Sequence, residues 1–256
     1  NGFAGAPINI WFLPFGKAMA ARKKLLAEAA GLIQEVKEGK HAGFLLANMA
    51  SEIDGEQMTE EELQDLVIQI LFGSYDTVLA LLRNLVCAWS DLMTDQRAAI
   101  VEEIDEVWDG RQPLEWEAKE KCFHHGQCGI FIKEVLRVKP SLPFVFRKVD
   151  KEVTIDGVTL PKGSPVFVSI IDRHSHLSEQ FGRAISLDND PDSYGSDYMP
   201  WGVGNRVCPG QKYAEMAAMV WLMHLSRYEI KVHERIETVF PWNAWLPQRL
   251  TVSPRV

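Results

Sequence analysis

The sequence predicts a mainly α-helical fold with small β-sheets. Apolar residues repeat at helical spacing in several long segments, whereas strand-like alternation is confined to short stretches. One of these, Glu152 to Leu160, alternates on either side of Asp156-Gly157, a two-residue hairpin signal. With 256 residues, 46% of them hydrophobic, the chain is long enough for one large core or two smaller ones.

The predicted helices begin and end at recognisable signals. Thr59 and Glu62 form a capping box, which predicts the start of a long helix over 60–88. This helix becomes apolar on all sides, and such a helix is expected to be buried. Another helix stops before Pro140, because proline disfavours helical backbone in the preceding residue. The remaining predicted helices are 17–38, 94–108, 126–138 and 212–227.

Short strands are expected at 166–171, 228–233 and 249–253. Between the first of them and Cys208 lie about forty residues with little periodicity, and loops of this length are usually functional. The uncharged segment 2–16 contains two prolines and is expected to form a loop, not a signal peptide.

Composition excludes several classes of function. The 27 Lys and Arg residues and 35 Asp and Glu residues give a net charge of −8, which argues against a nucleic-acid partner. The four cysteines form no C-x-x-C pair, so neither a disulfide framework nor a zinc ribbon is expected. No uninterrupted run of about 18 apolar residues occurs, so we expect no segment that must span a membrane.

The motif with the clearest chemistry is Trp201-Gly-Val-Gly-Asn-Arg-Val-Cys-Pro-Gly210, which directly precedes a predicted helix. Glycines allow the backbone to approach a flat cofactor, and Arg206 can pair with a propionate. A helix N-terminus favours a thiolate at Cys208. The alternative is that Cys208 is an ordinary small buried residue.

This motif resembles the heme-binding loop of the cytochromes P450, F-x-x-G-x-R-x-C-x-G, with Trp201 in place of Phe. The resemblance implies heme b (iron protoporphyrin IX) with the Cys208 thiolate as iron ligand. It also implies a cytochrome P450 fold that is incomplete, with its N-terminal part missing. Residues 1–256 would be the C-terminal portion of one such domain, from the G helix region onward. The implied cofactor-binding residues are Arg147, His174, Trp201, Gly204, Arg206, Cys208 and Gly210.

A second motif, Glu134-Val-Leu-Arg137, places an acid and a base on one helical face. By itself it reads as a solvated ion pair. Its position before Cys208 resembles the family's K helix, where Glu and Arg have a structural role together with an Arg from a later loop. Arg183 is our prediction for that third residue. Arg147 and His174 stand where the family often places propionate partners, and a surface arginine and an internally bonded histidine are the alternatives.

A third motif, Phe72-Gly-Ser-Tyr-Asp-Thr77, lies inside the long apolar helix. There Gly73 costs about 1 kcal/mol in helix propensity, and Asp76 would be a buried charge. The segment resembles the family's [AG]-G-x-[DE]-T-[TS], in which a widened helix turn makes a groove for dioxygen. The resemblance implies that Asp76 and Thr77 are catalytic and relay protons. Ser74 and Val78 depart from the pattern.

The family chemistry implies a monooxygenase that inserts one atom of O2 into a lipophilic substrate such as a sterol, retinoid, terpenoid or fatty acid. Electrons would come from a separate reductase, either a flavoprotein or a ferredoxin system. The opening segment looks most like the branch of retinoic-acid and plant steroid hydroxylases. The implied substrate-lining residues are Leu71, Phe72, Gly73, Phe144, Val145 and Trp245.

Two alternatives stay open. One is a heme-thiolate hydroperoxide isomerase or dehydratase, which needs no reductase. The other is a truncated, non-catalytic fragment, because lost helices would expose apolar surface. A eukaryotic protein of this family is expected at the endoplasmic reticulum through a missing N-terminal anchor, and a bacterial one in the cytoplasm.

Overall fold

The computed structural model describes residues 9–40, 45–50, 57–110, 126–238 and 243–255. Its fold is mainly α-helical with small two-stranded sheets, as predicted. The chain divides into two compact units, Asn1–Tyr75 and Asp76–Val256. All of the cysteine-loop and K-helix residues predicted above belong to the second unit.

The first unit contains helices α1 (Pro14–Lys37) and α2 (Leu45–Ala50) and the beginning of α3 (Glu60–Asp91). The capping box at the start of α3 is confirmed, because the Thr59 amide donates to Glu62 Oε2 over 2.8 Å. The Glu62 amide donates in return to Thr59 Oγ1 over 3.3 Å. Helix α2 was not predicted from the sequence.

Helix α3 differs in exposure along its length. In its first part Leu71, Phe72 and Tyr75 are 51%, 61% and 68% exposed. In its second part Leu81 and Leu85 are at most 1% exposed. The prediction of a buried helix therefore holds only for the second part. By length and composition α3 also meets the criteria for a membrane-spanning helix, which the sequence analysis did not anticipate.

The core of the second unit lies where the buried part of α3 meets three further helices and strand β5. Trp89 of α3 packs edge-on against Phe131, with ring centroids 6.2 Å apart. Helix α6 contacts both α4 and α8, and α8 contacts β5. These elements are α4 (Thr94–Val107), α6 (Gln127–Val138), α8 (Gln211–Leu225) and β5 (Tyr228–Thr238).

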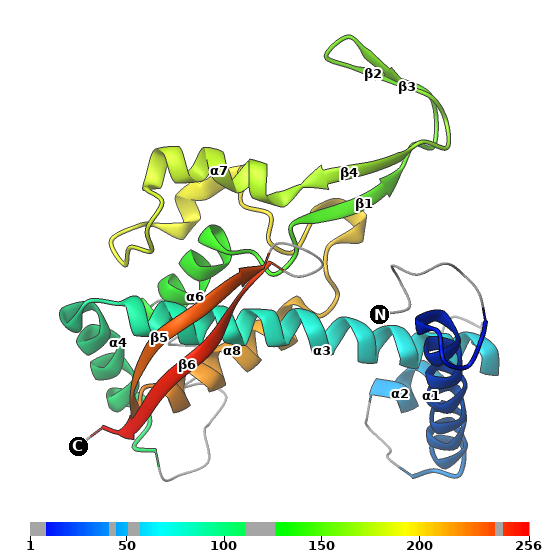
Figure 1. Ribbon diagram of the computed structural model, residues 1–256, viewed down its shortest axis with the longest axis horizontal. Coiled ribbons are helices and arrows are strands. Elements are labelled where there is room, and N and C mark those ends of the chain that lie inside the picture. The colour runs from blue at the N-terminus through cyan, green and yellow to red at the C-terminus, as the bar shows by residue number, and fades with distance from the viewer. Residues whose placement is uncertain (1–8, 41–44, 51–56, 111–125, 239–242, 256) are drawn as a thin grey trace. The chain divides into compact units, whose positions relative to one another are not determined.

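The strands form antiparallel ribbons (Figure 1). The β5–β6 ribbon is longer than predicted, and β1, which pairs with β4, was not predicted. At the far end of the β1–β4 ribbon lies the predicted hairpin, whose turn has positive φ at Asp156 and Gly157 (48° and 80°). The strands are β1 (Phe144–Lys148), β2 (Val153–Ile155), β3 (Val158–Leu160), β4 (Pro165–Ser169) and β6 (Ala244–Pro254).

Helix α7 (Ile170–Phe181) occupies the first part of the predicted long loop. The sequence analysis predicted a loop here because it found little periodicity, and the segment is also poor in strong helix formers. Two signals were nevertheless present. Ser169 caps the helix by accepting from the Asp172 amide over 3.1 Å. The buried residues Ile170, His174 and Leu177 share one face at helical spacing.

Candidate functional site

The loop from Trp201 to Cys208 is closed by a backbone hydrogen bond. The Cys208 amide donates to the Trp201 carbonyl over 2.9 Å. Gly202 and Gly204 have φ of 75° and 70°, a region that residues with a Cβ rarely adopt. Space beside Gly204 is open, since no heavy atom lies within 4 Å of the position that its Cβ would take. Gly202 and Gly204 are therefore required by the backbone of this turn, whereas Gly210 has a φ of −88°.

Cys208 is a free, half-buried cysteine. It lies two residues before Gly210, the N-cap of α8, and the helix begins at Gln211. A Cβ at Gly210 would lie 3.8 Å from Cys208 Sγ, so the sulfur packs over this glycine. The sulfur thus lies beside the N-terminus of α8, where the first backbone N–H groups have no partner within the helix.

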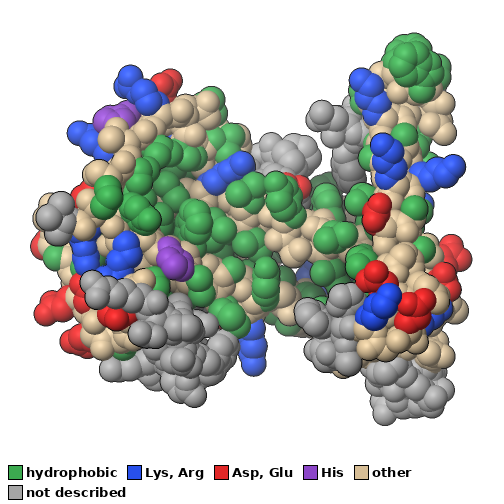
Figure 2. Space-filling model, turned by 90° about the horizontal axis from the view of Figure 1, so that it is seen from below, with side chains coloured by type: hydrophobic (Ala, Val, Ile, Leu, Met, Phe, Trp, Pro, Cys, Tyr) green, Lys and Arg blue, Asp and Glu red, His purple; other side chains and the backbone are tan. Residues whose placement is uncertain are grey.

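Exposed apolar groups flank the sulfur in sequence. Val203 is 52% and Val207 is 46% exposed, on a loop between α8 and Trp201, which is partly buried and packs against the core. Hydrophobic side chains are exposed on the face that Figure 2 presents. The open glycine turn, the free thiol and apolar side chains fit a flat, apolar cofactor such as heme.

The predicted propionate partners differ in their surroundings. Arg206 is exposed, and its guanidinium is available to an anionic group. Arg147 is half-buried in β1, and its Nη1 donates to the Phe146 carbonyl over 2.8 Å.

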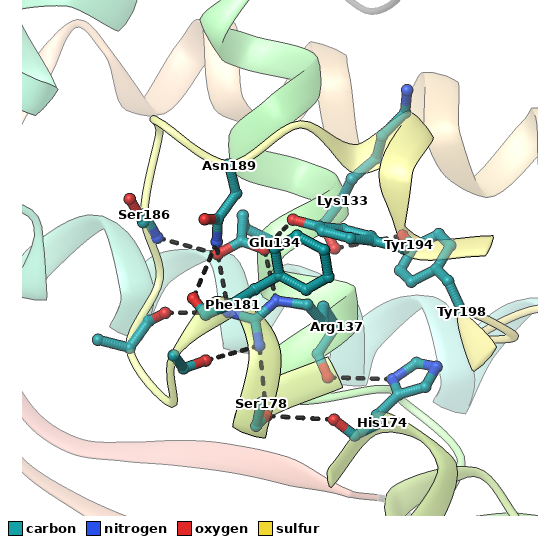
Figure 3. A network of polar contacts seen from close by, with 12 residues as sticks. Lys133, Glu134, Arg137, His174, Ser178, Phe181, Ser186, Asn189, Tyr194 and Tyr198 are labelled. Atoms are coloured by element: carbon teal, nitrogen blue, oxygen red, sulfur yellow. Dashed lines mark hydrogen bonds and ion pairs between the residues drawn. The ribbon is translucent and has the colours of Figure 1, made fainter. Parts of the chain in front are cut away.

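Glu134 and Arg137 form a fully buried ion pair on α6 (Figure 3). Arg137 Nε donates to Glu134 Oε1 over 2.5 Å, and Nη2 donates to Oε2 over 2.9 Å. The remaining guanidinium protons are donated to the Ser178 hydroxyl and the carbonyls of Gly182 and Ala184. All five guanidinium N–H groups are therefore bonded. This is a desolvated pair and not the solvated surface pair that spacing alone would favour.

The third partner of the pair is not Arg183, which corrects the sequence prediction. The side chain of Arg183 is exposed, and only the carbonyls on either side of it reach Arg137. The Glu134 carboxylate instead accepts from Asn189 Nδ2 over 3.0 Å, from the Ser186 amide and from the Tyr194 hydroxyl (Figure 3). Burial, together with the neighbouring carboxylate, raises the pKa of Tyr194. Neutral donors therefore stand where a second arginine was expected.

His174 has a structural position, which corrects its prediction as a propionate partner. Its Nδ1 lies 3.0 Å from the Arg137 carbonyl, and its Nε2 accepts from the Met199 amide over 3.0 Å. The ring is 3% exposed and stacks on Tyr198. Burial lowers the pKa of His174 to about 4. The imidazole is consequently neutral, with Nδ1 protonated, and both nitrogens are used within the protein.

Asp76 and Thr77 are half-buried neighbours at the start of the second unit. Helix α3 continues as a regular α-helix through them, without the widened turn expected from the family pattern. Because Asp76 keeps part of its surface exposed, it is not the fully desolvated charge expected from the sequence.

The predicted substrate-lining residues are divided between the two units. Leu71, Phe72 and Gly73 belong to the first unit. Phe144 and Val145 are consecutive in β1 and project to opposite faces of the ribbon. Phe144 joins an aromatic cluster with Phe146 and Phe167, in which ring centroids are 4.8 to 5.2 Å apart.

Trp245 has a partly buried ring with two cationic neighbours. Arg235 Cζ lies 4.7 Å from the ring centroid, and Lys139 Nζ lies 5.7 Å from it. Its backbone amide donates to the Oδ1 atom of Asn84 over 2.7 Å. Sequence reasoning missed Asn84, although a polar residue among the apolar positions of α3 is a signal that could have found it.

The sequence profile described as Cytochrome P450 matches residues 9–252. Beta-amyrin 28-monooxygenase of Panax ginseng is 26% identical over 269 residues, covering 99% of this chain and 53% of that protein. Abscisic acid 8'-hydroxylase 1 of Oryza sativa subsp. japonica is 28% identical over 236 residues, covering 88% and 48%. The chain spans about half the length of the curated relatives it matches.

The fold is similar to solved structures of the same family. A retinoic acid-bound cyanobacterial cytochrome P450 superposes with a TM-score of 0.85 at 20% identity, covering 98% of this chain and 60% of that one. The heme domain of cytochrome P450DA gives 0.81 at 18% identity, covering 96% and 56%. With the profile matching nearly the whole length, this chain belongs to the cytochrome P450 family.

Proposed function

We propose that this chain supplies the thiolate side of a heme monooxygenase that inserts one oxygen atom of O2 into a lipophilic substrate. The observation that carries the proposal is Cys208: a free, half-buried thiol behind a closed glycine turn and at the start of α8. The relatives named above are a monooxygenase and a hydroxylase, which supports the reaction class.

The cofactor we propose is heme b, which supplies the chemistry of oxygen binding and activation when bound. Cys208 would be the iron ligand, with Trp201, Gly204 and Gly210 shaping the loop around it. Arg206 and Arg147 would pair with the propionates, because a guanidinium forms charge-assisted hydrogen bonds with carboxylates.

Asp76 and Thr77 would act as the proton-transfer pair. A carboxylate exchanges protons with solvent, and an adjacent hydroxyl both accepts and donates them. The partial exposure of both residues is consistent with proton uptake from water. We expect Thr77→Ala to release peroxide in place of product.

The substrate class we propose is a sterol, retinoid, terpenoid or fatty acid. Relatives named for β-amyrin and abscisic acid support it, as does a similar fold that binds retinoic acid. Electrons would come from a separate flavoprotein or ferredoxin reductase. We further propose that residues 1–256 are the C-terminal portion of a single domain, since the match spans the chain but about half of each relative.

The decisive test is the absorption spectrum of the reduced protein with carbon monoxide. Thiolate ligation by Cys208 predicts a strongly red-shifted Soret band that is lost in Cys208→Ala. Cys87→Ala is the matched control, because Cys87 is also a free cysteine but is fully buried in α3. Absence of the band in the unsubstituted protein would contradict the proposal and favour a non-catalytic fragment. Turnover of hydroperoxides without a reductase would favour an isomerase or dehydratase.

A further inference from the structure

Asn84 of α3 is a fully buried amide with all of its hydrogen bonds made inside the protein. Nδ2 donates to the carbonyls of Lys139 and Asn243, both over 3.1 Å, and Oδ1 accepts from the Trp245 amide over 2.7 Å. Its partners are 55 to 161 residues away in sequence. One side chain thus joins three distant segments of the second unit.

Each of these segments leads toward a residue that the family resemblance implies for the site: Thr77 for proton transfer, and Phe144 and Trp245 for lining the substrate. Asn84 stands seven residues after Thr77, close to two helical turns, so both lie on one face of α3. Lys139 is the C-cap of α6, and the segment that follows it runs into β1 and Phe144. Asn243 precedes β6, where Trp245 lies.

From this geometry we infer that Asn84 is a positioning residue that sets the walls of the substrate site. The inference rests on the proposed function. Asn84 holds the helix that carries Thr77 against the segments that lead to Phe144 and Trp245. A direct bond from the Asn243 amide to the Ser141 carbonyl, 2.9 Å long, links the latter two to each other but not to α3.

A side-chain amide matches the hydrogen-bonding groups that surround position 84. Two carbonyl oxygens and one amide hydrogen face it, and Asn offers two donors and an acceptor. Asn84→Asp has nearly the same shape and can still accept from Trp245, but it would turn a carboxylate oxygen toward two carbonyls. Asn84→Ala would leave all three backbone groups unpaired in a buried place.

The test compares two iron-binding probes of different size in the heme-loaded, full-length protein that carries this chain. Clotrimazole is a bulky lipophilic azole that contacts the walls of the site, whereas imidazole contacts little beyond the iron. For Asn84→Asp and Asn84→Ala we expect the dissociation constant of clotrimazole to rise about tenfold. That of imidazole should change by less than about twofold. Backbone exchange at Trp245 should also quicken, because its amide loses its acceptor in Asn84→Ala.

The matched control is Ser90→Ala. Ser90 is also on α3, and its hydroxyl accepts from the Val232 amide of β5 over 2.8 Å, so its loss removes one bond between α3 and the C-terminal ribbon. It should leave both affinities unchanged. Equal loss of clotrimazole affinity in Ser90→Ala, or none in either Asn84 variant, would overturn the inference alone. Absence of the thiolate band in the unsubstituted protein would overturn the proposed function as well.

Discussion

Glu134 and Arg137 illustrate what a fully desolvated ion pair requires of its surroundings. Removing two charges from water costs more than their attraction returns unless the other lone pairs and protons are also bonded. Here the carboxylate accepts from three further donors, and the guanidinium donates to three further acceptors. The pair therefore fixes α6 against the segment between α7 and Tyr194.

His174 makes the stability of this region depend on pH. In the unfolded chain its imidazole binds a proton near pH 6.5, whereas in the folded protein burial lowers its pKa to about 4. Hydrogen bonding to the backbone of Arg137 and Leu136 opposes this lowering of the pKa, as does the charge of Asp197, whereas the Arg137 guanidinium adds to it. Between these values the unfolded state binds more protons. The contribution of His174 to stability is therefore fully present above about pH 6.5 and is lost as pH falls toward 4.

We expect the free energy of unfolding to fall by up to about 3 kcal/mol over this range because of His174 alone. Urea titrations between pH 7 and pH 4 measure it, and His174→Gln should flatten the decline. His176→Gln is the control, since His176 is exposed on the same helix. An equal pH dependence in the His174→Gln variant and the unsubstituted protein would refute the expectation.

Single residues were predictable from the sequence where their chemistry lay close together along the chain. The Glu134–Arg137 pair and the glycines of the cysteine loop follow from short spacings. The partners of Asn84 and the bonds of His174 did not, because they join residues from 25 to 161 positions apart. Arg183 was chosen by residue type, whereas folding brought Asn189 to the carboxylate.

Among the elements, most helices were predictable, but α2 and α7 were not, although α7 has the same 12 residues as the predicted α6 in length. Helices α3, α4, α6 and α8 begin and end within a few residues of expectation, because capping and periodic apolar residues mark them. Helix α7 combines weak propensity with a strong tertiary face, so its burial against α6 decides its structure. The β5–β6 ribbon exceeds its predicted strands because pairing extends past the apolar runs.

Two glycines allow backbone conformation to be separated from packing. Neither Gly73 nor Gly204 has a heavy atom within 4 Å of its would-be Cβ, but only Gly204 has positive φ. We expect Gly73→Ala to stabilise α3 by up to about 1 kcal/mol, because alanine is the better helix former. Gly204→Ala should destabilise by about 1 to 2 kcal/mol through backbone strain. Urea unfolding compares them, and shifts of the same sign would contradict this reasoning.

At the scale of the whole molecule, helix α3 runs through both units, and its side chains are less buried in the first unit than in the second. In the first unit α3 buries only Leu63 and Val67 and exposes its residues around Phe72, whereas its residues from Ala80 onward contribute to the core of the second unit. Fold class was predictable because it depends on periodicity summed over many residues. The division into units was not, since it depends on long-range contacts.

Hydrogen exchange should reveal this inequality. Amides of α3 before residue 76 should exchange at least about a hundredfold faster than those at 81–89, because exposed helix opens locally while core helix opens only with the unit. Mass spectrometry of peptides from the two parts of α3 measures the difference. Uniform protection along the helix would mean that another surface covers its first part.

The contacts of Arg137 with the carbonyls of Gly182 and Ala184 have a consequence for how this region changes over generations. Gly182 has a φ of 87°, which favours glycine, but at position 184 every residue type supplies the same carbonyl, so a substitution there leaves the bond to Arg137 intact as long as the chain keeps its path. Substitutions at that position are therefore expected to have little effect on stability, while substitutions of Glu134 or Arg137 would break the ion pair. A contact made through a backbone carbonyl can thus be retained in the structure even when no residue type in the sequence marks it.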